Sequence, residues 1–279
     1  MAARFPERVT NRSDALMKYN RVLITGAAGR IAKHIREHLA PRCNELRLAD
    51  CIAFEAHHAH ETAHLVDLSV EAQIAPLLEG VDAIVHLAGF PREASWATIL
   101  PGNVVAVANL WEAALQAGVR RVVYATSNHA VGFYPRSQRI DGNVASRPDS
   151  RYGVAKVFME SVASLYADKY GITAMGIRIG HCAPEPSDAR MLSHWVHPED
   201  LADLVELGLT ASIDHEIVYG VSANSATWWD NSRAEALGYA PKHSADTFAE
   251  ALRDKRSDSD VAERYQGGSF VAAEYVQRR

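Results

Sequence analysis

Residues 21–32, RVLITGAAGRIA, join an apolar, β-branched strand pattern to a glycine-rich turn and the start of a helical pattern. Gly26 permits a tight turn after the strand, and Gly29 lets the backbone approach a ligand at the first turn of the helix. The N-terminus of a helix carries unpaired N–H groups and a partial positive charge, which suit a pyrophosphate. This unit therefore predicts a dinucleotide-binding fold of the α/β class.

Short β-rich runs alternate with helical patterns from residue 21 to about residue 180. This order is typical of a parallel sheet covered by helices on both faces. We predict a Rossmann-type doubly wound parallel sheet with a small C-terminal substrate lobe. The expected domains are an N-terminal arm (1–20), a cofactor-binding Rossmann domain (21–180) and a lobe (181–279) that returns a strand, 216–223, to the sheet. The other predicted strands are 21–25, 45–50, 82–89, 120–126 and 172–180, and the helices are 29–40, a segment within 103–117, and 151–171.

Composition excludes several classes of protein. The chain has 48% hydrophobic and 23% charged residues, as a globular protein does, and its net charge of −5 offers nothing to a polyanion such as nucleic acid. No apolar run approaches the roughly 20 residues of a membrane span. The polar N-terminus does not resemble a secretory signal, and three cysteines without metal-type spacing suit a reducing compartment. We expect a cytoplasmic protein with no nucleic-acid or membrane partner.

Asp50 ends the second predicted strand, where a dinucleotide-binding fold places an acidic residue against the adenosine ribose. A carboxylate accepts hydrogen bonds from the ribose hydroxyls and repels the 2′-phosphate of NADP. The predicted cofactor is therefore NAD. Two further segments, Asp67-Leu68 and Leu87-Ala88-Gly89, fall where adenine and the adjoining ribose lie in such folds.

Tyr152 and Lys156 are four residues apart in YGVAK, so a helix places both on one face. A phenol with a reference pKa of about 10 is a poor base at neutral pH. A nearby ammonium group stabilises the phenolate and lowers that pKa. Ser127 ends the preceding predicted strand and is followed by Asn128 and His129, so three polar side chains reach the edge of the sheet where ligands bind.

TGAAGRIA, Asp50, Ser127 and YGVAK together resemble the extended branch of the short-chain dehydrogenase/reductase family, which is NAD-dependent and epimerase/dehydratase-like. In that family the tyrosine transfers the proton, the lysine holds the nicotinamide ribose and tunes the tyrosine, and the serine hydrogen-bonds the reacting oxygen. The resemblance implies these catalytic roles for Tyr152, Lys156 and Ser127.

A narrower resemblance, over residues 21–270, is to bacterial uronate dehydrogenases. It rests on TSNHAVGFYP, RIGHCAPEP, RMLS, WWDNS and YQGGSF. Those enzymes oxidise the anomeric carbon of galacturonate or glucuronate to a lactone and pass hydride to NAD. The resemblance implies that Asn128 and His129 contact the sugar, that Arg190 meets its carboxylate, and that Cys182 makes a main-chain contact with the cofactor.

The predicted ligand-binding residues form two groups. The predicted cofactor-binding residues are Gly26, Gly29, Arg30, Ile31, Asp50, Asp67, Leu68, Leu87, Ala88, Gly89, Lys156 and Cys182. The predicted substrate-binding residues are Pro91, Ser127, Asn128, His129, His181 and Arg190.

Two of these residues depart from the uronate dehydrogenase pattern, which has substrate-binding serines where this chain has Pro91 and His181. Proline lacks a hydroxyl and a backbone donor, and histidine adds bulk and a titratable group. An NAD-dependent aldose or sugar-phosphate 1-dehydrogenase, acting for example on arabinose or glucose 6-phosphate, is therefore the alternative. HLAGFPREASW (86–96) is similar to archaeal enzymes of that kind. A nucleotide-sugar epimerase or dehydratase fits less well, because dehydratases of this branch usually have Asp-Glu where this chain has Asn128-His129.

Other conspicuous residues carry simpler predictions. The histidines of AHHAHETAH (56–64) are expected to form a solvated loop, and no metal site is predicted. The tryptophans of WWDNS (228–232) are expected to pack in the lobe, and the charged run 253–260 to be exposed. Helices 103–117 and 151–170 are those that the family pairs across a twofold axis, so the resemblance implies a homodimer or a multiple of it.

Overall fold

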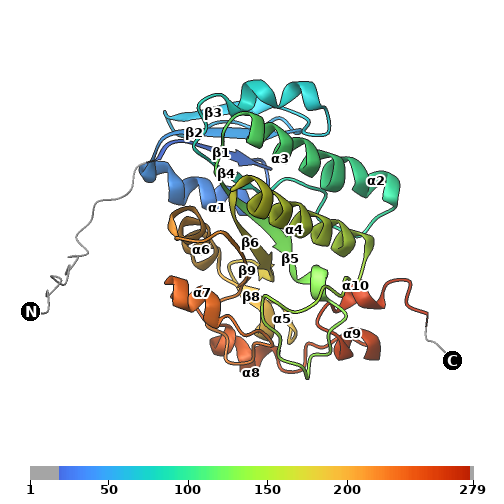
Figure 1. Cartoon of the computed structure of the whole chain (residues 1–279). Coiled ribbons are helices and arrows are strands. Elements are labelled where there is room, and N and C mark those ends of the chain that lie inside the picture. The colour runs from blue at the N-terminus through green and yellow to red at the C-terminus, as the bar shows by residue number, and fades with distance from the viewer. Residues whose placement is uncertain (1–18, 277–279) are drawn as a thin grey trace, which may run out of the picture.

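The computed structural model describes residues 19–276, so the predicted arm lies outside the described residues except for Tyr19 and Asn20, which begin the first strand. Seven parallel strands form one sheet in the order β3-β2-β1-β4-β5-β6-β9 (Figure 1). The predicted doubly wound parallel sheet is confirmed. Its strands are β1 (Tyr19–Thr25), β2 (Cys43–Asp50), β3 (Glu61–Leu65), β4 (Ala83–His86), β5 (Arg121–Ser127), β6 (Thr173–Ile179) and β9 (His215–Gly220).

Strands β1 and β4 are hydrogen-bonded to each other, and the strand order reverses between them. From β1 the sheet continues through β2 to β3 at one edge, and from β4 it continues through β5 and β6 to β9 at the other. Ligands of open parallel sheets bind at such a reversal, outside the carboxyl ends of the strands. Strand β4 is shorter than the predicted 82–89, because the chain leaves the sheet after His86 and Gly89 has a left-handed φ of 136°. Residues 87–89 therefore belong to the loop at the crevice.

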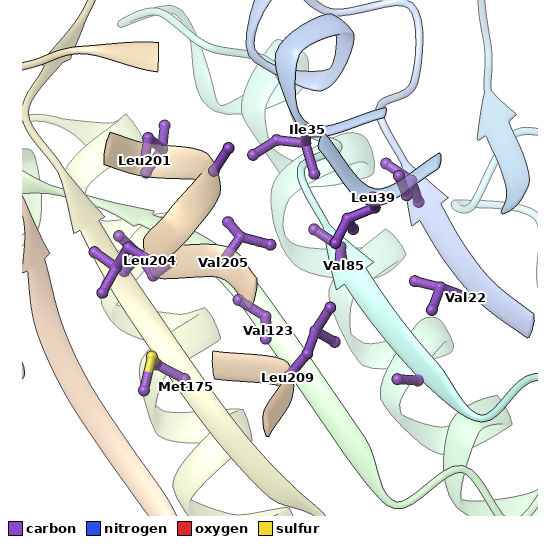
Figure 2. Close-up of a cluster of buried hydrophobic side chains, with 14 of the residues drawn as sticks. Val22, Ile35, Leu39, Val85, Val123, Met175, Leu201, Leu204, Val205 and Leu209 are labelled. Atoms are coloured by element: carbon purple, nitrogen blue, oxygen red, sulfur yellow. The ribbon is translucent and has the colours of Figure 1, made fainter. Parts of the chain in front are cut away.

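Helices cover both faces of the sheet, as the alternating pattern predicted. On one face lie α1 (Arg30–Leu39) and α6 (Pro198–Thr210), whose apolar side chains pack on the strands (Figure 2). Helix α6 was not predicted, although its apolar residues recur at helical spacing. The other face carries α3 (Ala106–Gln116) and α4 (Arg151–Tyr170), packed on a second apolar cluster that includes Trp111 and Tyr124.

A short helix, α2 (Trp96–Leu100), continues through one π-helical turn, Pro101–Val105, into α3. By length and composition alone this 21-residue run could cross a membrane: an 18-residue window of it has a mean hydropathy of 1.2, and 39% of that window is buried inside the structure. A core helix of a globular protein passes the same test. The prediction that no apolar run approaches a membrane span missed this helix, whose apolar residues are interrupted by Pro101, Gly102 and Asn103.

Beyond β6 the chain forms a cap of short elements below the carboxyl edge of the sheet (Figure 1). Its predicted boundary at residue 180 falls directly after β6, while α6 and β9 return to the layers of the sheet. Trp229 is fully buried and stacks on Tyr219, so the predicted packing role is confirmed for this residue. The elements are β7 (His181–Cys182), α5 (Met191–His194), β8 (Trp195–Val196), α7 (Ser232–Leu237), α8 (Ala249–Leu252), α9 (Asp260–Arg264) and α10 (Ser269–Ala272).

Two predictions about histidines and charges can be compared with the structure. Residues 253–259 are almost all exposed, as expected of that charged run. The histidine-rich stretch is not simply a solvated loop, because His64 lies in β3 and the Nε2 atoms of His60 and His64 are buried without a partner among the described residues. The stretch differs from the expected loop because its C-terminal part forms β3, which pairs with β2. The histidines themselves give no sign of this strand.

Candidate active site

The glycine-rich turn lies at the reversal point of the sheet and fits a dinucleotide. Gly26 has a φ of 71°, and a Cβ atom there would come within 2.6 Å of the backbone nitrogen of Ala88 at the exit of β4. Gly29 precedes the first turn of α1 in extended conformation and has no capping side chain. The backbone N–H groups at the start of α1 therefore remain available to phosphate oxygens.

Asp50 is at the end of β2, beside this turn. Its Oδ2 accepts a hydrogen bond from the backbone nitrogen of Ala28 at 3.0 Å, and its Oδ1 accepts one from Ile52 at 3.1 Å. These bonds fix the carboxylate at the mouth of the turn. Each oxygen still has a second lone pair for a ribose hydroxyl.

Five of the remaining predicted cofactor positions adjoin the glycine-rich turn, and Asp67, Leu68 and Cys182 lie on other segments. Arg30 and Ile31 form the first turn of α1, and Leu87, Ala88 and Gly89 leave β4 beside Gly26. Asp67 is exposed and caps its own turn by accepting hydrogen bonds from Ser69, whereas Leu68 is buried. Cys182 lies in β7. Burial raises the pKa of its thiol to about 12, and the positive charge of the nearby Arg30 opposes this rise in part.

Ser127, Tyr152 and Lys156 come together where β5 meets the first turns of α4. Ser127 is buried and accepts a hydrogen bond from the backbone nitrogen of His129 at 3.2 Å, so it also caps the short turn 128–131. The Lys156 Nζ lies 5.5 Å from the centroid of the Tyr152 ring and donates to the Ala125 carbonyl at 2.7 Å. Gly153 lets α4 approach this turn, since a Cβ atom there would collide with the carbonyl oxygen of His129.

The protonation of the pair differs from the sequence-based expectation. Burial raises the pKa of Tyr152 to about 12, a hydrogen bond with Ser127 lowers it in part, and the charge of Asp149 raises it. Burial also lowers the pKa of Lys156 to about 8, against the opposing charge of Glu160. Lys156 is thus close to Tyr152, but in the protein alone desolvation outweighs the expected lowering of the phenol pKa.

His129 projects toward Tyr152 and is held from two sides. Its Nδ1 pairs with Asp149 Oδ2 at 2.7 Å, and the Asp149 carboxylate is fully buried. Its ring stacks on Phe270, with centroids 3.8 Å apart, and stands edge-on to Tyr152 at 5.8 Å. A neutral His129 that donates through Nδ1 leaves Nε2 as an acceptor for a sugar hydroxyl.

Arg190 is the predicted anion-binding residue, and no carboxylate in the described part of the chain lies within ion-pair distance of its guanidinium. Its Nε and Nη2 donate to the Gln266 carbonyl at 3.0 and 2.5 Å. In the amide orientation that satisfies both groups of Asn128, the Asn128 oxygen accepts from Arg190 Nη2 at 3.3 Å. Burial and the nearby Arg136 lower the pKa of Arg190 to about 10, so it is still a cation at neutral pH.

The two departures from the uronate dehydrogenase pattern lie in different settings. Pro91 is exposed in the loop after β4. His181, in β7, is half-buried and lies among the charges of Asp188, Arg190 and Arg30. Burial lowers the pKa of His181, with opposing effects from these neighbours, so this histidine is neutral at pH 7. It therefore adds a neutral donor and acceptor near Arg190.

Several residues that support this site were missed from the sequence. Glu93 accepts from the backbone nitrogen of Tyr152 at 2.9 Å and pairs with Arg151 at 2.7 Å, which ties the loop after β4 to α4. His194, which carried no motif, is buried, stacks on Trp228 and bonds the Arg190 carbonyl. Glu93, Asp149 and Gln266 lie at least 20 positions from the residues that they hold, whereas His194 bonds Arg190 only four positions away. The sequence signals for this network are the motifs HLAGFPREASW, which contains Glu93, WWDNS and YQGGSF.

Two groups of histidines and carboxylates lie away from this site, between α1, α6 and the segment after α7. One comprises His197, Glu199 and His243, and the other His38, Asp203 and Glu206, with ligand atoms within 4.8 Å in each group. Most of these side chains already have protein partners, such as His38 with Glu206 at 2.6 Å. The expectation that the protein uses no metal stays a prediction.

The sheet reversal and the glycine-rich turn beside Asp50 define an α/β protein of the dinucleotide-binding type, in which Ser127, Tyr152 and Lys156 are grouped where β5 meets α4. Residues 22–208 match the model of the NAD dependent epimerase/dehydratase family. The chain belongs to that family.

Three known proteins show how near this chain lies to particular members. It is 44% identical over 259 residues to the uronate dehydrogenase of Pseudomonas putida, covering 91% of this chain and 97% of that protein. It is 32% identical to the NAD-dependent glucose-6-phosphate dehydrogenase of Haloferax volcanii, over 81% of this chain and 95% of that protein. A crystal structure of a mutant uronate dehydrogenase from Agrobacterium tumefaciens complexed with NAD is 40% identical, with a TM-score of 0.87 over 91% of this chain and 97% of that one.

Proposed function

We propose that this protein is an NAD-dependent dehydrogenase that oxidises the anomeric C1 hydroxyl of a hexuronate, galacturonate or glucuronate, to the aldarolactone. The observation that carries the proposal is the Arg190 guanidinium, which has no ion-pair partner among the described residues and reaches Asn128 beside Ser127. Other buried arginines, Arg36 and Arg178, are each neutralised by a glutamate. The 40–44% identity to uronate dehydrogenases supports the same substrate class.

The side chains at the end of β5 and the start of α4 suit removal of a proton from the C1 hydroxyl. Ser127 would donate a hydrogen bond to that oxygen, and Tyr152 would accept its proton. Bound NAD supplies the acceptor for the C1 hydride. Lys156 would hold the nicotinamide ribose, and its charge beside the Tyr152 ring would stabilise the phenolate. Positioning of the sugar by Asn128, His129 and Arg190 then contributes much of the rate.

The residues at the reversal of the sheet support NAD as the cofactor. Gly26 lies so close to Ala88 that no side chain fits at position 26, which keeps the turn open to a pyrophosphate. The Asp50 carboxylate beside the turn would repel the 2′-phosphate of NADP. The sequence-based choice of NAD agrees with the family and with the NAD complex of a 40% identical enzyme. Residues 181–279 provide the substrate lobe in this proposal.

A sugar-phosphate 1-dehydrogenase is the second candidate, favoured by Pro91 and His181 and by the 32% identity to a glucose-6-phosphate dehydrogenase. The exposed Arg92 follows Pro91 and offers a further cation for a phosphate. NADH formation from NAD with galacturonate, glucuronate, glucose, arabinose and glucose 6-phosphate distinguishes the two. Turnover of the uronates above the others supports the proposal, whereas turnover of glucose 6-phosphate alone selects the second candidate.

The functional unit in this proposal is a cytoplasmic homodimer or a multiple of it. Exposed apolar side chains line the helices of one face of the sheet, which suits pairing with a second copy of the chain. Light scattering after gel filtration tests this, and a mass of one chain would contradict it. The exposed apolar residues are Trp96, Leu100 and Val105 on the α2–α3 run and Val154 and Leu165 on α4.

A further inference from the structure

The YQGGSF segment, residues 265–270, has no role in the mechanism described above, yet it contacts both Arg190 and His129. We propose that this C-terminal loop positions the Arg190 guanidinium for the substrate anion, with Gln266 as the positioning residue. The inference rests on the proposed function in taking Arg190 as the group that receives the anion. The inference extends the proposed function by naming Gln266 as the residue that fixes where the anion binds.

Gln266 is completely buried and every polar group it carries has a partner. Its Nε2 donates to the carbonyls of Pro135 and Gln138 at 3.2 and 2.9 Å, and its Oε1 accepts from the Trp229 indole at 3.0 Å. Its backbone nitrogen donates to the Tyr134 carbonyl at 2.9 Å. The side chain is therefore locked to two other segments of the chain, and the lock fixes the direction of the Gln266 carbonyl.

The Gln266 carbonyl in turn fixes Arg190. It accepts from both Nε and Nη2, so a single oxygen holds one edge of the planar guanidinium. Gly268, with a φ of 63°, lies against the same edge, where a Cβ atom would come within 2.5 Å of Nε. The opposite group, Nη1, has no hydrogen-bond partner among residues 19–276, so the loop orients the guanidinium with Nη1 unpaired.

The chemistry of the holding group determines what the arginine can do. A carboxylate in place of the carbonyl would neutralise Arg190, as Glu61 neutralises Arg36. A neutral carbonyl holds the geometry and leaves the positive charge for the ligand. The arrangement is that of an anion-binding site whose geometry is set before the ligand arrives, so it should lower the KM of an anionic substrate.

The same loop supports the other side of the sugar site. Gly267 packs directly on the Asp149 carboxylate that holds His129, and Phe270 stacks on the His129 ring. Residues 266 and 268 therefore act on the anion end of the site, while 267 and 270 act on the hydroxyl end. A substitution at Gln266 should affect the anion more than the rest of the sugar.

The first test compares Gln266→Met with Gln138→Met. Methionine matches the size of glutamine but removes the three side-chain hydrogen bonds of Gln266. Gln138 has an exposed side chain and contributes only its backbone carbonyl to the network, which methionine keeps. For Gln266→Met we expect the KM for galacturonate to rise at least 10-fold, while kcat and the KM for NAD change less than 3-fold. Gln138→Met should match the wild type. An equal loss in kcat and in NAD affinity would mean a general structural role and would overturn the inference.

A double-mutant cycle with Arg190→Met tests whether Gln266 acts through the arginine. If it does, Gln266→Met changes kcat/KM less than 2-fold when Arg190 is already methionine. Full additivity of the two effects overturns the inference. If Gln266→Met does not fold, as judged by thermal unfolding and NAD binding, Trp229→Phe replaces it. This substitution removes the donor to Oε1 together with part of the buried indole ring, and it should give a smaller rise in the KM for galacturonate. No rise would count against the inference.

The wild-type reaction separates failure of this inference from failure of the proposed function. A wild type that oxidises glucose 6-phosphate rather than uronates refutes the proposed function, but the same variants then test the positioning of Arg190 on the phosphate. A wild type that oxidises only neutral sugars refutes both. A uronate dehydrogenase in which Gln266→Met leaves the KM for galacturonate unchanged keeps its function and loses this inference.

Discussion

In the proposed active site, the cofactor side is built mainly from backbone, whereas the substrate side is built from side chains that hold one another. At the ends of β1 and β4, the turn at Gly26 and the first turn of α1 are neighbours in sequence and need small residues rather than particular contacts. On the substrate side, His129 depends on Asp149 and Phe270, and Arg190 depends on Gln266. The cofactor side can be predicted from one short motif, whereas the substrate side depends on contacts between segments that are distant in the sequence.

This difference implies that the two sides respond separately to substitution. A change at the cofactor side should alter the KM for NAD and leave the KM for the sugar unchanged. A change at the substrate side should alter the KM for the sugar and leave the KM for NAD unchanged. Tyr152 and Lys156 stand where the two sides meet, so substitutions there should affect the reaction itself or the stability of the whole molecule.

The largest effect is expected for Tyr152→Phe. The variant keeps the aromatic ring that stands edge-on to His129 but loses the proton acceptor, and kcat should fall by about 10²–10⁴-fold. The binding of NAD, followed by fluorescence, should change little. Retention of more than a tenth of the wild-type kcat would remove Tyr152 from the catalytic role.

Lys156→Met should reveal the cost of burying an ammonium group between the two sides. The pKa of Lys156 is about 8 in the folded protein and near 10.5 in a solvated chain. Between these values the unfolded chain binds more protons, so the wild type gains stability as the pH rises, by about 2 kcal/mol from pH 8 to pH 10 relative to the variant. Urea unfolding at both pH values measures the difference in the free energy of unfolding between the wild type and the variant. A difference that does not change with pH would contradict the burial of a titrating lysine.

Asp50→Ser should disturb the cofactor side alone. Loss of a carboxylate that accepts ribose hydrogen bonds should raise the KM for NAD about 10-fold and narrow the preference for NAD over NADP. The KM for the sugar should stay within 2-fold of the wild-type value. Equal changes in both KM values would show that the two sides are coupled.

Asp149→Asn is the matched change at the substrate side, with the smallest expected effect. Asparagine keeps the shape of the carboxylate but no longer holds the His129 Nδ1 proton with a charge, so the KM for the sugar should rise about 5-fold. The KM for NAD should not change. An unaltered sugar KM, with the variant folded, would indicate that His129 does not need this partner.

The same contrast decides how much could be predicted from the sequence. The parallel sheet, the turn at Gly26, and the meeting of Ser127 with Tyr152 and Lys156 follow from local patterns whose spacing fixes their geometry. The roles assigned to Arg190, His129 and the other ligand-binding residues stay predictions that the geometry supports.

Other features could not be read from local patterns. Glu93, Asp149 and Gln266 act on residues up to 76 positions away in the chain, and pairing over such distances leaves no periodic signal. The raised pKa of Tyr152 was missed for a different reason. The motif shows a nearby lysine, but the depth of burial that opposes it exists only in the folded molecule.

The central claim is that this chain binds a sugar through its carboxylate and oxidises it at C1 with NAD. Galacturonate and galactose share their ring configuration and differ only in having a carboxylate or a hydroxymethyl group at C5. The kcat/KM for NADH formation with each sugar therefore isolates the contribution of the anion. We predict a value for galacturonate at least about 30-fold above that for galactose, since loss of the partner of a buried charge costs about 2–5 kcal/mol. Equal values for the two sugars would contradict the account.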